Sequence, residues 1–181
     1  MKRRFFSLRR AATFLVIAGL LVAMVVGTQT PSNQSLYGVA RVSDGDSVRL
    51  QNQRIRLVGI DAPELKQNCR RDGNDWACGE AARSALKSKI AAQEITCTGD
   101  RRDQYRRLLA VCYLGREDLN AWLVREGWAV SYNDYAIDEV LARRDRRGIW
   151  DSEFESPHKW RAIRGAAESS SFGWLTQFWP F

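Results

Sequence analysis

Apolar and polar positions alternate along the middle of this 181-residue chain, which is typical of short, half-buried β-strands. Two of these segments are joined by the tight turn "QNQ", so we expect them to form a hairpin. Two later segments are separated by the charged loop "GDRRDQYRR". The predicted strands are residues 36–42, 47–50, 54–60, 94–98 and 108–114, and residues 128–132 are also expected to be extended.

Helical spacing of apolar residues predicts three helices, which are residues 79–92, 117–127 and 134–148. Gly127 and Gly148 are expected to end the second and third helices, because glycine readily adopts a left-handed cap. In the third helix, Ile137, Val140 and Leu141 are expected to face inward. Five short strands with interposed helices predict a mainly β fold with helices (α+β), a five-stranded OB-fold barrel with three helices.

A basic head and an apolar run open the chain, and they predict a hydrophobic helix that precedes the barrel. The apolar run, residues 11–27, fits either a cleaved signal peptide or an uncleaved membrane anchor, and a buried core helix is the alternative. Either of the first two readings places the rest of the chain outside the cytoplasm, periplasmic or secreted. The expected limits are 1–27 for this segment, 28–36 for a polar linker, 37–162 for the folded domain, and 163–181 for a Ser-rich linker with an aromatic tail.

The net charge of +7 does not by itself indicate a nucleic-acid-binding surface. Five of the 28 basic residues lie in the first ten positions, and no acidic residue precedes Asp44. From residue 28 onward, 23 basic residues oppose 21 acidic ones, which leaves a net charge of only +2. The aromatic tail is open to two readings, as a segment on a membrane interface or as one that packs or frays.

The four cysteines form an even set, as expected for an oxidising compartment. Their positions favour pairing Cys69 with Cys78, around a polar loop, and Cys97 with Cys112, on adjacent strands. Reduced cysteines are the alternative for each pair. Because the chain has no C-x-x-C pair and a single histidine, a zinc site is not expected.

Acidic residues gather where the predicted hairpin strands begin and end. Asp44 and Asp46 precede the first of these strands, and Asp61 and Glu64 follow the second. The strands run antiparallel, so the acids meet at one edge of the sheet, where a hard cation such as calcium would relieve their repulsion. An EF-hand is excluded because the twelfth position from Asp44 is Ile55. Asp44 can also be read as a turn residue only.

Arginines accompany these acids. Arg56 lies among apolar residues in a strand, so it needs an anionic partner, either a protein group or a substrate. The charged loop can be a solvated surface or a clamp in which two arginines hold a phosphate, and Tyr105 within it suits nucleotide contact. The arginines of this loop are Arg101, Arg102, Arg106 and Arg107.

Four ordered motifs, "DGDSVRL", "RLVGIDAPE", "DQYRRLLA" and "NAWLVREGWA", resemble the staphylococcal nuclease (thermonuclease) family. The resemblance covers about residues 37–162 and ends with "GIW" and "PHKWR". It implies the same five-stranded OB-fold barrel with three helices. By this resemblance, Asp46 and Asp61 match the carboxylates that bind calcium (Ca2+), and Ala62 matches a ligand through its backbone carbonyl. Glu64 matches the acid that positions or deprotonates the attacking water.

The resemblance also assigns residues that contact the substrate. Arg56 and Arg107 match the two arginines that hold the scissile phosphate. Tyr105 matches a tyrosine near the terminal phosphate of the nucleotide, and either Tyr132 or Tyr135 matches the second such tyrosine.

One residue departs from the family pattern, because Arg106 stands where "DxYGR" has a glycine. If this position has a positive φ, arginine costs roughly 1 kcal/mol there. Arg106 is then a further candidate for phosphate binding, beside Arg107.

The resemblance implies an extracytoplasmic, calcium-dependent nuclease that cleaves DNA or RNA at the 5′ P–O bond and leaves 3′-phosphate ends. The alternative is a non-catalytic OB-fold module that binds nucleic acid while tethered to the membrane, which predicts that the catalytic acids or arginines are missing. They are all present. A third reading is a calcium-stabilised surface protein whose aromatic tail is the working part. The chain is expected to be a monomer.

Overall fold

The fold is described from a computed structural model, which covers Ile17 and residues 33–132 and 134–164. The predicted hydrophobic helix at 11–27, apart from Ile17, and nearly all of the tail segment 163–181 lie outside the described residues. In the part of the chain that is described, no helix is both long and apolar enough to cross a membrane.

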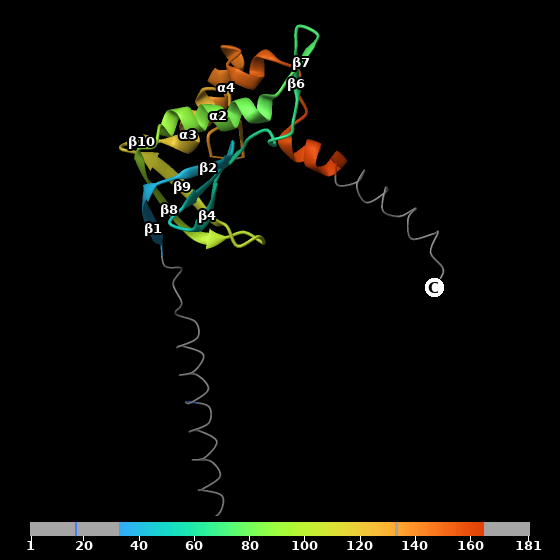
Figure 1. Ribbon diagram of the computed structural model, residues 1–181. Helices are drawn as coiled ribbons and strands as arrows, with labels where there is room; N and C mark the ends of the chain where they lie inside the picture. The colour runs from blue at the N-terminus through green and yellow to red at the C-terminus, as the bar shows by residue number, and fades with distance from the viewer. Residues whose placement is uncertain (1–16, 18–32, 133, 165–181) are drawn as a thin grey trace, which may run out of the picture. The chain divides into compact units, whose positions relative to one another are not determined.

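The largest element of the fold is a curled sheet, which has seven strands within residues 33–132 and 134–164 (Figure 1). Neighbouring strands run antiparallel, except that β4 and β9 are parallel. The strands follow one another in the order β1 (Gln34–Val39), β8 (Glu94–Arg102), β9 (Leu108–Leu114), β4 (Gln53–Leu57), β3 (Ser47–Leu50) and β2 (Arg41–Asp44), and β10 (Glu117–Asp118) pairs with β9. Two shorter sheets are formed by β5 (Ile60–Asp61) with β11 (Val130–Ser131), and by β6 (Cys69–Arg71) with β7 (Asn74–Trp76).

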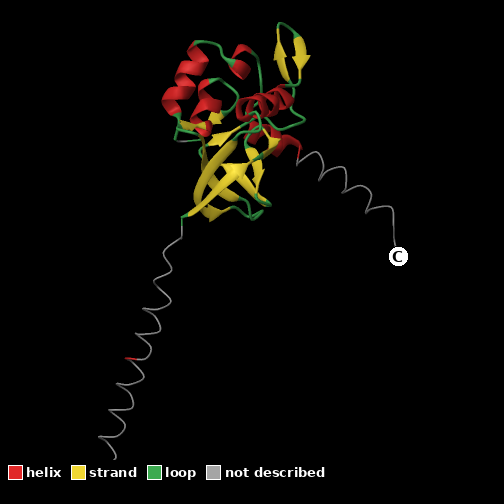
Figure 2. Cartoon of the chain, turned by 60° about the vertical axis from the view of Figure 1, so that its left-hand side comes forward, coloured by secondary structure: helices red, strands yellow, loops and turns green. Residues whose placement is uncertain are grey.

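The two outer strands of the large sheet belong to one segment of chain. β1 and β2 stand at opposite ends of the strand order, yet only Ala40 separates them in the sequence. The sheet must therefore curl so that this segment serves both of its edges, and Figure 2 shows the resulting barrel-like shape.

The core follows the predicted alternation of apolar residues. On β3 and β4, Val48, Leu50, Ile55 and Leu57 are buried, while the positions between them are more exposed. Burying an aliphatic side chain of this size contributes about 1.5–3 kcal/mol, so these strands are held mainly by their inner faces. The Cys97–Cys112 disulfide joins register partners on β8 and β9 inside this core.

Four helices lie in the described residues and gather at one end of the sheet (Figures 1 and 2). They are α2 (Cys78–Ile90), α3 (Leu119–Arg125), α4 (Ala136–Arg144) and residues 157–164, and a 3-10 turn, η1, spans Gly148–Asp151. α2 buries Ala82, Leu86 and Ile90 at the predicted helical spacing.

The mixed α+β class is confirmed, but the numbers of strands and helices differ from the prediction. The first predicted strand is divided at Ala40. Glu117 and Asp118, expected in a helix, pair with β9, and the Asp118 side chain accepts backbone hydrogen bonds from Asn120 and Ala121 as the N-cap of α3. The helix at 157–164 was not predicted.

The inward face predicted for α4 is wrong. Ile137 and Val140 are 79% and 64% exposed. The helix instead packs by a face that carries Ala142 and two acids with polar partners. Asp138 pairs with Arg125 at 3.8 Å, and Glu139 accepts a hydrogen bond from the backbone N–H of Ser131. The apolar stripe therefore did not identify the packed face.

The loop expected between Cys69 and Cys78 is the β6–β7 hairpin, and it projects from the helical end of the molecule (Figure 1). The predicted Cys69–Cys78 disulfide closes its base, so both predicted disulfides are confirmed. The hairpin holds the C-terminal segment, because the backbones of Arg70 and Glu153 exchange two hydrogen bonds of 2.8 Å. The Arg71 guanidinium adds bonds to the carbonyls of Asp151 and Gly148.

Candidate active site

A cleft of about 700 Å³ lies where the β3–β4 hairpin meets the loop before β9. Six of the predicted site residues line it, which are Asp46, Arg56, Ala62, Glu64, Tyr105 and Arg107. Asp61 lies directly beside it, because its carboxylate bonds to Arg56. The hairpin thus brings together residues that the sequence placed at its two acidic ends.

Arg56 joins the two carboxylates predicted as metal ligands. Its Nη1 lies 2.9 Å from Oδ2 of Asp46, and its Nη2 donates to Oδ1 of Asp61 at 2.7 Å. Both acids are buried, at 4% and 5% exposed. Burial raises the pKa of the Asp46 carboxyl, and the nearby Arg56 guanidinium and the Ser47 hydroxyl counter that rise. Arg56 therefore has the anionic partner that its place in the strand required.

Asp44 belongs to the turn that carries Asp46. Its carboxylate accepts a hydrogen bond from the Gly45 N–H, and burial raises its pKa to about 6, with the charges of Asp46 and Glu64 adding to the rise. The turn is packed closely, since a Cβ on Gly45 would stand 2.7 Å from the Cβ of Ala62. Only glycine fits this approach.

Glu64 is held by a buried glutamine that the sequence analysis did not single out. The Glu64 N–H donates to Oε1 of Gln67 at 3.1 Å, and the Gln67 N–H donates to the Glu64 carbonyl at 2.7 Å. The start of α2 presses on the same backbone, because a Cβ on Gly79 would lie 1.8 Å from the Glu64 oxygen. The main chain of Glu64 is therefore fixed on two sides.

Arg161, on the helix at 157–164, lines the cleft and was also not predicted from the sequence. Its Nη1 donates to Oε1 of Glu64 at 2.6 Å and to Oδ1 of Asp61 at 3.0 Å, and its Nη2 donates to Oδ2 of Asp61 at 3.0 Å. Burial would lower the Arg161 pKa, but these hydrogen bonds and charges raise it overall. The only signal was its position in "PHKWR", which gave no indication of which residues it contacts.

The loop that carries Arg107 is organised around Asp103. This carboxylate accepts hydrogen bonds from the backbone N–H groups of Tyr105 and Arg107 and from Nε of Arg107 at 2.7 Å. Burial would raise the Asp103 pKa, but these bonds lower it overall. Arg107 also extends towards β3, with Nη1 3.4 Å from the Ser47 hydroxyl. Arg106 has a φ of +64°, the left-handed conformation that was suspected at this position.

Three residues that were predicted to contact the substrate do not line this cleft, which are Arg106, Tyr132 and Tyr135. Tyr132 is 66% exposed, and the hydroxyl of Tyr135 donates to Oδ2 of Asp118 at 3.2 Å. Burial, together with the Asp118 charge, raises the Tyr135 pKa. Arg106 is also not among the lining residues, whereas Tyr105 is, with 60% of its surface exposed.

The donor atoms of the cleft suit a hard cation, although they are not arranged around one. Among the described residues, no group of three or more His, Cys, Asp or Glu side chains is placed to hold a metal ion. The buried carboxylates of Asp46 and Asp61 are oxygen donors of the kind that calcium prefers, and both already face positive charge on Arg56. The chemistry of these donors therefore fits calcium at oxygens that guanidinium groups also contact.

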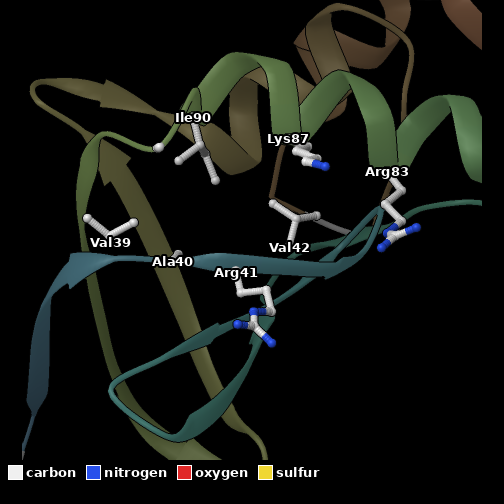
Figure 3. Close-up of a pocket in the computed structure, with 8 residues that line it drawn as sticks. Val39, Ala40, Arg41, Val42, Arg83, Lys87 and Ile90 are labelled. Carbon is white, nitrogen blue, oxygen red and sulfur yellow. The ribbon is translucent and has the colours of Figure 1, made fainter.

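A second hollow, of about 550 Å³, lies between β2 and α2 (Figure 3). Its basic lining residues are Arg83 and Lys87 on α2 and Arg41 on β2. Val39, Val42 and Ile90 supply apolar lining. None of the predicted site residues lines this hollow, whereas six of them line the first cleft.

Comparison with known proteins decides the family. The family model described as "Staphylococcal nuclease homologue" matches residues 54–152, more than half of the chain. This chain belongs to the staphylococcal nuclease family. The cleft described above lies largely within the matched region, and Arg161 lies beyond it.

Curated relatives of this family member agree with that assignment. An uncharacterized endonuclease of Escherichia coli is 37% identical over 135 residues, covering 68% of this chain and 82% of that protein. The micrococcal nuclease of Shigella flexneri is 32% identical over 168 residues, covering 80% and 91%. The succinoglycan biosynthesis protein ExoI of Rhizobium meliloti is 31% identical over 153 residues, covering 80% of each chain. This staphylococcal nuclease homologue is thus a hydrolase of the phosphodiesterase and endonuclease class.

Proposed function

We propose that this staphylococcal nuclease homologue is an extracytoplasmic, calcium-dependent nuclease that hydrolyses phosphodiester bonds of DNA or RNA. One observation carries the proposal. Glu64, two buried aspartates and two arginines meet at one cleft, which is the set that water attack on a phosphodiester needs.

The protein groups divide the work as follows. Glu64, on a main chain fixed by Gln67 and α2, orients the attacking water and accepts its proton. Arg56 and Arg107 hold the phosphate and stabilise the negative charge that accumulates on its oxygens. In other enzymes, removing one preorganised donor to a developing negative charge costs about 3 kcal/mol of transition-state stabilisation.

Asp46, Asp61 and the carbonyl of Ala62 are the residues that would hold calcium. When bound, this ion supplies Lewis-acid polarisation of a phosphate oxygen. Their burial supports the role, because buried carboxylates need compensating positive charge. Asp103 positions Arg107, and Tyr105 stands exposed at the rim where a nucleotide would contact it. Tyr132 or Tyr135 would provide the second tyrosine contact, and Arg106 an additional phosphate contact.

The location and organisation of the chain complete the proposal. Two disulfides are compatible with an oxidising compartment, which supports an extracytoplasmic location in which residues 11–27 are a signal peptide or an inner-membrane anchor. We place the nuclease domain, an OB-fold barrel, at about 37–162, between the linker at 28–36 and the tail at 163–181. Its first strand, β1, already begins at Gln34, and the helix that starts at residue 157 extends to residue 164. The protein works as a monomer.

The direct test incubates the full chain with denatured DNA and with RNA, with calcium or with a chelator. We expect degradation that stops in the chelator. Degradation that is indifferent to chelator would contradict the calcium mechanism. Binding of nucleic acid without any cleavage would favour the non-catalytic module instead.

A Glu64→Gln variant separates chemistry from binding. We expect nucleic-acid binding close to that of the wild type, with cleavage slower by about two orders of magnitude or more, because general-base assistance is lost. Equal loss of binding and cleavage would show that Glu64 is structural.

A further inference from the structure

Arg161 contacts both Asp61 and Glu64, the two acids to which the proposed function gives separate tasks. Its guanidinium contacts Glu64 through Nη1 and both oxygens of Asp61 through Nη1 and Nη2. A paired contact of this kind fixes the plane of a carboxylate as well as its position. A lysine in its place would supply charge without the fork.

The position of Arg161 is set by contacts that do not involve the cleft. The Gln67 side-chain amide donates to the Glu155 carbonyl at 2.7 Å, two residues before the helix at 157–164 begins. The paired backbone bonds of Arg70 and Glu153 hold the preceding residues on the β6–β7 hairpin. In Figure 1 this helix lies beside the base of the hairpin. The contacts of Glu153 and Glu155 therefore fix the segment before the helix at 157–164, and this helix places Arg161 at the cleft.

Negative and positive side chains lie close together in the cleft. The carboxylates of Asp46, Asp61 and Glu64 face two guanidiniums, those of Arg56 and Arg161. Both oxygens of Asp61 already accept hydrogen bonds from arginine. A cation that binds Asp61 must therefore share these oxygens with Arg161 or replace it, and the two positive charges repel each other at that short range.

We propose that Arg161 is a positioning residue of this nuclease, which orients Asp61 and Glu64 and competes with the divalent cation for them. The inference rests on the proposed function, in that it takes Asp61 as a metal ligand. The charge of Arg161 weakens cation binding, and the paired N–H groups of its guanidinium set the orientation of Glu64 for water. The two effects can be separated experimentally, because a lysine at this position keeps the positive charge but lacks the paired N–H groups.

The test measures calcium binding by titration calorimetry on the full chain without nucleic acid, and turnover in parallel. Arg161→Gln should bind calcium about tenfold more tightly than the wild type, because one competing charge is removed. Arg161→Lys should bind calcium as the wild type does. Both variants should show kcat lowered about tenfold with little change in KM, because neither restores the fork.

Lys159→Gln is the matched control, since it removes one charge from the same helix at an exposed pair with Glu155. It should change neither calcium affinity nor kcat. Calcium binding by Arg161→Gln that is equal to or weaker than that of the wild type would overturn the competition. Wild-type kcat in Arg161→Lys would overturn the positioning role, and this variant carries the test if Arg161→Gln does not fold.

Asp61→Asn distinguishes failure of this inference from failure of the proposed function. Loss of calcium binding in Asp61→Asn, with Arg161→Gln unchanged from the wild type, would overturn the role of Arg161 alone. Calcium binding that survives in Asp61→Asn would overturn the metal assignment, and competition at Asp61 with it.

Discussion

Gln67 and Glu155 are joined by a 2.7 Å hydrogen bond across 88 residues of sequence. The same fully buried glutamine accepts the Glu64 N–H and donates its own N–H to the Glu64 carbonyl. One side chain thus ties the main chain of the proposed catalytic acid to the segment that leads into the helix of Arg161. The chain around Glu64 and the segment that leads into the helix at 157–164 are therefore connected through the side chain of Gln67.

The first prediction concerns that connection. Gln67→Leu keeps the volume but leaves the partly buried Glu64 N–H and Glu155 carbonyl without their side-chain partner. A fully buried group without a partner costs about 1–3 kcal/mol, and these two are partly buried, so we expect the free energy of unfolding to fall by about 2 kcal/mol. Urea unfolding monitored by circular dichroism measures it. Gln93→Leu, at an exposed glutamine, is the control and should stay within about 0.5 kcal/mol of the wild type.

The second prediction uses the backbone of Arg106. Because φ is +64° there, a side chain is strained and glycine is not, so Arg106→Gly should raise the free energy of unfolding by up to about 1 kcal/mol. Arg101→Gly, in strand β8, should have the opposite effect, because glycine weakens a strand. Thermal unfolding of the two variants compares them. A loss of stability in both would mean that the loop does not store this strain.

A third prediction follows from the lowered pKa of Asp103. A carboxylate whose folded pKa lies below its unfolded value of about 3.9 stabilises the fold above that value, and this contribution is lost as the pH falls through the folded pKa. Asp103→Asn should therefore be less stable than the wild type at neutral pH, and the gap should narrow below about pH 4. Urea unfolding at several pH values measures it, and a gap that is constant down to pH 2 would contradict the prediction.

A fourth prediction separates the two disulfides. Replacing Cys97 and Cys112 with alanine should lower the free energy of unfolding by about 3 kcal/mol, given the 15-residue separation and burial of the pair. Replacing Cys69 and Cys78, which are nine residues apart, should cost about 2.5 kcal/mol. It should also lower kcat under conditions where the protein is folded, because the hairpin supports the segment that carries Arg161. Equal kcat in both double variants would contradict that support.

Much of the sheet could be predicted from the sequence because its strands have one buried face. Val48, Leu50, Ile55 and Leu57 alternate with more exposed residues, and this alternation is visible without coordinates. The convergence of Asp46 and Asp61 was predictable for a related reason, since a tight antiparallel hairpin leaves little choice about which residues meet.

Other features depend on contacts between distant segments, and local pattern does not encode these. Nothing in "PHKWR" indicates that Arg161 reaches Asp61, which precedes it by 100 residues. The packed face of α4 was missed because partnered acids replace apolar residues on it, so hydrophobic spacing pointed to Ile137 and Val140 instead. Gln67 and Asn120 were missed because a buried amide is identified by its partners. The Asn120 amide donates to the carbonyls of Val58 and Ala110.

The segment that forms β1 and β2, on either side of Ala40, affects how the protein resists aggregation. Because β1 and β2 cover both margins of the large sheet, one stretch of about ten residues hides the backbone edges of β8 and β3 together. Exposed strand edges are templates for pairing with other chains. If the β1–β2 segment detached, it would expose the edges of β8 and β3 together. Resistance to aggregation therefore depends on how stably this segment remains paired with both strands.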